Sequence, residues 1–196
     1  TRFAREAAAA TRAPGADGRL VVAFLGRLVE RKGAVELIAA LAALDPVVLA
    51  RIEVRIGGKG PLIGSLTEAV ARHGLGDTVT FAGFVAEEDK AGFYADADIA
   101  VFPATGGESF GIVLVEAMAS GAGVVLAGAN PGYLSVIGDQ PQVSVDARNV
   151  RAFAEALTLL IQSPGLRADL HAEQAQRVQR FDVETVGAQM LDLYGM

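Results

Sequence analysis

Short apolar runs that alternate with longer segments of helical periodicity most limit how this chain can fold. The runs lie at residues 19–26, 51–58, 78–84, 98–104, 122–128 and 141–145. Runs that are apolar throughout, and separated by helices, are typical of a parallel sheet covered on both faces. Since such crossovers are right-handed, the pattern predicts an α/β fold, a Rossmann-like doubly wound parallel sheet of about six strands.

The predicted helices fill the segments between and after these runs. They lie at residues 33–44, 60–74, 87–97, 109–120, 149–163, 165–181 and 183–195. The segment at 128–138 lacks a clear helical pattern, so we expect a loop there. The chain has 196 residues, which suits one sizeable domain rather than two.

Composition excludes several classes of function. The chain is 52% hydrophobic with a formal net charge of −6, so it can bury a core and lacks the basic excess of a nonspecific nucleic-acid-binding protein. It has no cysteine, which excludes a thiol nucleophile and a zinc–thiolate site. No run approaches the roughly 18 apolar residues of a membrane span. Cytoplasm fits this composition.

Ligands of doubly wound sheets bind at the carboxyl ends of the strands, so the loops there are the candidate site. The first loop holds Gly26, Arg27 and Lys32. A guanidinium and an ammonium ahead of a helix can bind phosphate oxygens. The alternative is that Arg27 and Lys32 are solvated loop cations without a ligand, which would give the same sequence pattern.

The second and third loops carry weaker signals. The second, "GGKGP", is a glycine-dense turn that either approaches a ligand or only reverses the chain. The third holds Phe84, Val85, Glu87 and Lys90. Its apolar part could line a pocket for a flat base, and an ordinary capped helix start is the alternative.

The fourth loop is the most informative, because it leads into a helix and has an acid at each end. Glu108 precedes the helix, and Ser109 is a suitable N-cap residue. The first-turn amides, which favour a negative ligand group, would belong to Phe110, Gly111, Ile112 and Val113. Gly111 would leave room where the ligand comes closest.

Glu116 follows Ile112 by four residues and so lies on the same helix face, one turn further in. An acid in the first turns of a helix is common, but the neighbours of Glu116 are apolar. A carboxylate there needs partners, and two vicinal sugar hydroxyls would provide them.

The remaining titratable residues give no second site. His73 and His171 lack a nucleophile at a recognisable spacing, and Asp96 and Asp98 precede the fourth strand, at the opposite edge of the sheet. We find no metal-ligand cluster in the sequence and expect no essential metal or cofactor.

Five motifs in a fixed order resemble the C-terminal domain of retaining family-4 glycosyltransferases, which have the GT-B architecture of two Rossmann-like domains. The resemblance covers roughly Leu20 to Tyr194, and its most specific part is the pair of acids separated by seven residues. The motifs are "GRLVERKG", "GGKGPL", "VTFAGFV", "YADADIAVFPA" and "ESFGIVLVEAMASG".

The resemblance implies a role for each loop in binding a nucleotide-sugar donor. Arg27 and Lys32 would hold the diphosphate, and Glu116 would accept from both ribose hydroxyls. Glu108 would bind hydroxyls of the transferred sugar. The base would meet the backbone of Val85, with Glu87 or Lys90 helping to choose it. Amides near the sugar and phosphates would come from Phe110, Gly111 and Ile112.

Within that family the chain is most similar to the phosphatidyl-myo-inositol mannosyltransferases of actinobacteria, through "GGESFGIVLVEAMA", Lys90 and the tail "RVQRFD". This likeness implies GDP-mannose as the donor and work at the inner face of the plasma membrane. The chain departs from the family at 128–138, where Gly-Gly and a Glu are common, and at "PQVSVDARN". These departures leave open whether that loop contacts the donor sugar.

The resemblance also divides the chain. Residues 1–18 would be a leftover inter-domain segment and 19–180 the donor-binding domain. Residues 181–196 would form a helix that crosses back to an N-terminal acceptor-binding domain. The expected reaction is metal-independent transfer of a hexose to an acceptor hydroxyl with retention of configuration.

Three alternatives remain. The donor could be UDP-glucose or another nucleotide sugar, with an acceptor other than phosphatidylinositol. The domain could bind nucleotides without catalysis, or serve as an interaction module. A dinucleotide-dependent oxidoreductase fits least, because "GRLVERKG" is not the glycine fingerprint of those enzymes.

Glu108 could in principle be a nucleophile, as in retaining hydrolases, although its glycine neighbours suit hydroxyl binding better.

Overall fold

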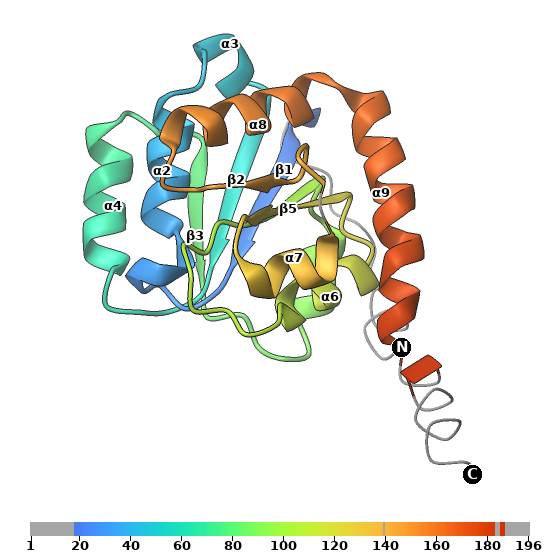
Figure 1. Ribbon diagram of the computed structural model, residues 1–196. Coiled ribbons are helices and arrows are strands. Elements are labelled where there is room, and N and C mark those ends of the chain that lie inside the picture. The colour runs from blue at the N-terminus through green and yellow to red at the C-terminus, as the bar shows by residue number, and fades with distance from the viewer. Residues whose placement is uncertain (1–17, 139, 183–184, 187–196) are drawn as a thin grey trace, which may run out of the picture.

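A single parallel sheet of six strands forms the centre of the molecule (Figure 1). The computed structural model describes residues 18–138, 140–182 and 185–186. The strand order is β3-β2-β1-β4-β5-β6 and every pairing is parallel. The order reverses between β1 and β4, which is the switch point of a doubly wound sheet. The predicted fold class is confirmed.

The central strands are buried on both faces, whereas the outer ones are partly open. Every residue of β4 and β5 is buried, while β3 alternates between buried and more exposed positions. This difference explains why the central runs are apolar throughout. The strands are β1 (Leu20–Leu25), β2 (Ile52–Gly57), β3 (Val79–Gly83), β4 (Ile99–Phe102), β5 (Val124–Gly128) and β6 (Ser144–Val145).

Two separate hydrophobic clusters fill the two sides of the sheet. The first is packed mainly by α2 (Ala34–Ala42), α3 (Pro46–Leu49), α4 (Ile63–Arg72) and α8 (Val150–Gln162). The second is packed by α5 (Lys90–Ala95), α6 (Ile112–Ala119), α7 (Pro131–Ile137) and α9 (Pro164–Val178). Two short 3-10 turns, η2 (Glu30–Lys32) and η3 (Gln179–Phe181), complete the described elements.

Two helices were not predicted. The segment 128–138, expected to be a loop, contains α7, and the short α3 follows α2. Both begin with the same signal, an Asn or Asp cap followed by a proline. Asn130 Oδ1 accepts from the Tyr133 amide at 3.1 Å, and Asp45 Oδ1 accepts from the Val47 amide at 2.8 Å.

One predicted strand is shorter than expected, and predictions at both ends of the chain fall largely outside the described residues. The strand predicted at 141–145 is only two residues long. The segment 1–17, and most of the helix predicted at 183–195, lie outside the described residues. Within the part of the chain that the structure describes, no helix combines the length and apolarity needed to cross a membrane.

A buried glutamine joins α9 to the sheet. Because β6 pairs only with Ala127 and Gly128, it does not reach Val125. Gln174 of α9 fills that position: its Oε1 accepts from the Val125 amide at 2.8 Å, and its Nε2 donates to the Val125 carbonyl at 2.9 Å. One side chain thus satisfies both backbone groups of a buried residue.

We expect Gln174→Met to lower the free energy of unfolding by about 2–4 kcal/mol, because both buried groups of Val125 lose their partner. Urea denaturation followed by circular dichroism measures this loss. Gln176→Met, at an exposed position two residues along the same helix, is the matched control and should change stability little. An equal effect of the two substitutions would contradict the role of Gln174.

Candidate functional site

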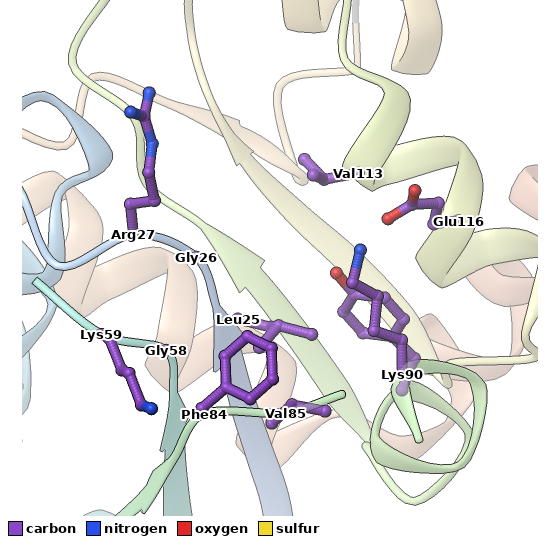
Figure 2. Close-up of a pocket in the computed structure, with 11 residues that line it drawn as sticks. Leu25, Gly26, Arg27, Gly58, Lys59, Phe84, Val85, Lys90, Val113 and Glu116 are labelled. Carbon is purple, nitrogen blue, oxygen red and sulfur yellow. The ribbon is translucent and has the colours of Figure 1, made fainter. Parts of the chain in front are cut away.

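A cavity of about 400 Å³ opens at the carboxyl ends of the strands, beside the switch point (Figure 2). This is where the fold class predicts a ligand site. Its walls come from the ends of β1, β2 and β3 and from α5 and α6. The lining residues are Leu25, Gly26, Arg27, Gly58, Lys59, Phe84, Val85, Lys90, Tyr94, Val113 and Glu116.

One wall of this cavity is apolar and aromatic. Figure 2 shows the Phe84 ring close to Leu25 and Val85. The Lys59 ammonium lies over the same ring, 4.9 Å from its centroid, at a distance typical of a cation–π contact. The Phe84 ring is 66% exposed, so this wall offers a flat apolar surface to a planar ligand group. Lys59, from the second loop, was not predicted as a site residue.

Glu116 lies on the other side of the cavity, on α6, and its carboxylate and the Lys90 ammonium point toward one another (Figure 2). Burial raises the pKa of Glu116, the charge of Lys90 lowers it and Glu87 raises it. The Lys90 ammonium also bonds the Glu87 carboxylate at 2.6 Å. Glu116 is therefore a partly desolvated acceptor that a pair of ligand hydroxyls could satisfy.

A buried tyrosine that sequence reasoning missed completes this wall. Tyr94 of α5 lines the cavity and is 1% exposed. Burial, followed by the nearby Glu116 carboxylate, raises the pKa of its hydroxyl. The hydroxyl therefore stays protonated and able to donate. Tyr94 lies among apolar residues in "GFYADA", a pattern that indicates a core residue and not a site residue.

A second cavity, of about 180 Å³, continues from the first. The two share Leu25, Gly26, Arg27 and Val113, and the second adds Lys32 and Tyr133. The two predicted loop cations, Arg27 and Lys32, thus line one continuous groove. An anionic group bound between the cavities would meet both of them.

Glu108 bonds two cations, one of which, Lys32, lines the second cavity. Its Oε1 lies 2.8 Å from Lys32 Nζ and 2.8 Å from Arg31 Nη1, and Arg31 also donates to the Gly107 carbonyl at 3.2 Å. The sequence assigned Lys32 and Glu108 to different parts of a ligand, but here they bond each other. Arg31 was missed, although it adjoins Lys32 in the same cationic turn.

The start of α6 differs from prediction. The helix begins at Ile112 and its N-cap residue is Gly111, not Ser109, whose side chain makes no capping bond. Phe110 and Gly111 therefore precede the first turn, and the Leu114 amide already bonds the Gly111 carbonyl at 2.9 Å. The first-turn amides that lack intrahelical acceptors are those of Ile112 and Val113.

The structure gives a packing reason for Gly111. Gly111 is buried with φ of 156°, and an added Cβ would lie 3.0 Å from Tyr133 and 3.3 Å from Val136. An added side chain would therefore meet Tyr133, which lines the second cavity, and Val136 of the second hydrophobic cluster. Glycine is required there by the backbone conformation and by packing. The proposed roles of the Phe110 and Gly111 amides stay predictions.

Three of the predicted site residues at the start of α6 line neither cavity and are exposed. Ser109 is exposed, and the side chains of Phe110 and Ile112 are 43% and 65% exposed. They are close in sequence to the cavities, but the structure does not bring their side chains into the walls.

The acids excluded by sequence position do lie at the opposite edge. Asp98 Oδ2 accepts from the Val21 amide, at the amino end of β1, at 2.8 Å. Asp96 pairs with Arg55 at 3.2 Å. Among the described residues, no group of three or more His, Cys, Asp or Glu is placed to hold a metal ion.

Comparison with known proteins identifies the family. Residues 9–177 match the family "Glycosyl transferases group 1". The chain is 38% identical to a phosphatidyl-myo-inositol mannosyltransferase of Mycolicibacterium smegmatis, over 91% of this chain and 45% of that protein. It is 34% identical to a D-inositol 3-phosphate glycosyltransferase of Salinispora arenicola, over 89% of this chain and 41% of that protein.

Solved structures agree with this result. Anabaena HepE in complex with UDP and glucose superposes with a TM-score of 0.75 at 27% identity, covering 90% of this chain and 48% of that one. A sucrose-phosphate synthase of Thermosynechococcus elongatus superposes with a TM-score of 0.78 at 29% identity. The match covers 99% of this chain and 48% of that one.

The chain therefore belongs to the group 1 glycosyl transferases, as its motifs predicted, and its structural neighbours have the GT-B fold. It spans a little under half the length of the curated relatives that it matches.

Proposed function

We propose that this chain is the donor-binding part of a retaining hexosyltransferase whose donor is GDP-mannose. The observation that supports this most strongly is the continuity of the groove. The first cavity has an apolar wall that faces the Glu116 carboxylate, Arg27 lines both cavities, Lys32 lines the second, and Lys32 bonds a second carboxylate, that of Glu108. A nucleotide sugar presents its base, ribose, diphosphate and hexose in that same order.

Each segment of the groove then has one ligand group. The base lies against Phe84 and the backbone of Val85, and Glu116 accepts from the ribose hydroxyls. Arg27, Lys32 and the amides of α6 face the diphosphate. Glu108 accepts from hydroxyls of the hexose. Lys90 and Glu87, which already bond each other, lie where they could help choose the base.

The chemistry proposed for these groups is electrostatic. As the bond between the hexose C1 and the diphosphate breaks, negative charge grows on the leaving oxygen. In this proposal Arg27, Lys32 and the amides of Ile112 and Val113 stabilise that charge. Since cations of the chain already neutralise the diphosphate, we propose that no metal ion is essential.

The acceptor is proposed from the relatives. Two groups of them carry names that contain an inositol phosphate, one as the lipid phosphatidyl-myo-inositol and the other as D-inositol 3-phosphate. We propose an inositol-phosphate hydroxyl as the acceptor, in its lipid form, at the cytoplasmic face of the plasma membrane. Acceptor binding would fall to an N-terminal domain of the full-length protein.

The direct test is transfer of mannose from GDP-mannose to phosphatidylinositol by the full-length protein, with and without EDTA. We expect product in both, and calorimetry should detect binding of GDP. Loss of activity in EDTA would contradict metal independence. Transfer from UDP-glucose only, the nucleotide and sugar seen with HepE, would overturn the donor assignment. Binding of no nucleotide would favour an interaction module.

Glu108→Gln should lower kcat/KM for transfer about 10- to 100-fold, because the substitution weakens a charge-assisted hydrogen bond to the hexose. Initial rates at varied donor concentration measure the change. Glu68→Gln, at an exposed position on α4, is the matched control. Wild-type turnover in Glu108→Gln would contradict the role of Glu108 in binding the hexose.

The affinity for GDP should fall as the pH is lowered through the raised pKa of Glu116. The ionised carboxylate accepts from both ribose hydroxyls, whereas the protonated acid must lose its proton before it can do so. Because the pKa is raised, the fall should begin at a higher pH than for an ordinary Glu, whose pKa is about 4.3.

Calorimetry from about pH 5 to 8 measures this dependence, and Glu116→Gln should flatten it. The β-phosphate of GDP titrates in both proteins, so only the difference between them reports Glu116. Lys90→Met should shift the fall to still higher pH, since the charge of Lys90 lowers this pKa. Parallel pH profiles of the wild type and Glu116→Gln would contradict the assignment to ribose.

A further inference from the structure

The loop that carries Glu108 has little stiffness of its own. Three of the residues between 106 and 111 are glycines with positive φ: Gly106, Gly107 and Gly111, at 155°, 71° and 156°. Glycine opens more backbone conformations than any other residue. The ion pairs with Arg31 and Lys32 hold the Glu108 carboxylate, and two further contacts from other elements hold the backbone of its loop.

The first contact supports the loop from inside. Gly132, at the start of α7, lies so close to it that an added Cβ would be 2.1 Å from the Glu108 carbonyl oxygen and 2.9 Å from that of Phe110. The backbone of α7 is thus pressed against the backbone of the loop. This contact limits movement inward but leaves the outer side open.

The second contact closes the outer side and comes from the far end of the chain. The Phe110 ring meets the Phe181 ring edge to face, with centroids 5.6 Å apart and planes at 80°. Phe181 ends η3, directly after α9, and packs against the second hydrophobic cluster. Gln174 fixes α9 to β5, so Phe181 is held by the sheet and not by the loop.

We propose that Phe181 is a positioning residue for Glu108, and that its ring, through Phe110, holds the loop so that the Glu108 carboxylate faces the hexose of the donor. This proposal rests on the function proposed above. Phe181 does not line the cavities that would hold the base and diphosphate. Its loss should therefore weaken recognition of the hexose and leave recognition of the nucleotide unchanged.

The test compares the dissociation constants of GDP-mannose and GDP for the full-length protein by calorimetry, and those of UDP-glucose and UDP in parallel. We expect Phe181→Leu to raise the ratio of the sugar-nucleotide constant to the nucleotide constant about 3- to 10-fold, which is the size of one aromatic pair contact. Phe181→Tyr keeps the ring and should keep the wild-type ratio.

Two further variants separate positioning from general loosening of the fold. Val178→Ala removes a buried side chain from the same helix end and the same cluster, and should lower stability without changing the ratio. Phe110→Leu removes the other ring at a partly exposed position and should reproduce the effect of Phe181→Leu. The double variant should raise the ratio of dissociation constants little more than either single variant does.

Each result has one meaning. If Phe181→Leu and Phe110→Leu both leave the ratio unchanged while wild-type protein binds a nucleotide sugar, the positioning role is wrong and the proposed function stands. If Val178→Ala shifts the ratio equally, the effect is structural and the role is also wrong. If the wild type binds neither nucleotide nor nucleotide sugar, the proposed function itself fails.

Discussion

Burial of a parallel sheet on both faces is the constraint on which the rest of this structure depends. It requires central strands that are apolar throughout, such as β4 and β5, and helices that cover both sides. Because all strands run the same way, every loop at their carboxyl ends lies at one edge. Polar side chains that the core excludes can gather there, and in this protein they line the cavities together with apolar residues.

The groove places a buried tyrosine near each of its two acids. The charge of Glu116 acts on the Tyr94 hydroxyl, and the charge of Glu108 acts on the Tyr133 hydroxyl. Burial and the adjacent carboxylate raise the pKa of both hydroxyls, so each can donate while the acid beside it accepts. Each carboxylate, a hydrogen-bond acceptor, thus has a tyrosine hydroxyl, a hydrogen-bond donor, near it. This suits ligand hydroxyls, which both donate and accept.

Much of the fold followed from the sequence, because the alternation of apolar runs and helical patterns is a local signal. The start of α6 did not follow. Ser109 is the better capping residue by preference, but packing of Gly111 against Tyr133 and Val136 decides where the helix begins. The helix α7 was missed even though Asn130 and Pro131 mark its start, because an Asn-Pro-Gly run is also typical of a turn.

The candidate site was predictable where a residue directly follows a strand, as Arg27 and Val85 do. Its remaining partners depend on which strands are neighbours. Lys32 and Arg31 meet Glu108 only because β1 lies beside β4, and Lys59 meets Phe84 across β2 and β3. The sequence predicted a doubly wound sheet but not its strand order, so it could not show which loop residues form these ion pairs.

The glutamine that joins α9 to β5 also protects the sheet. A strand whose backbone groups face outward can pair with another chain, which is a route to aggregation. The shortness of β6 would leave Val125 in that position. Gln174 occupies both groups of Val125, so a helix takes the place of a strand there and this part of the edge is closed to a second copy of the protein.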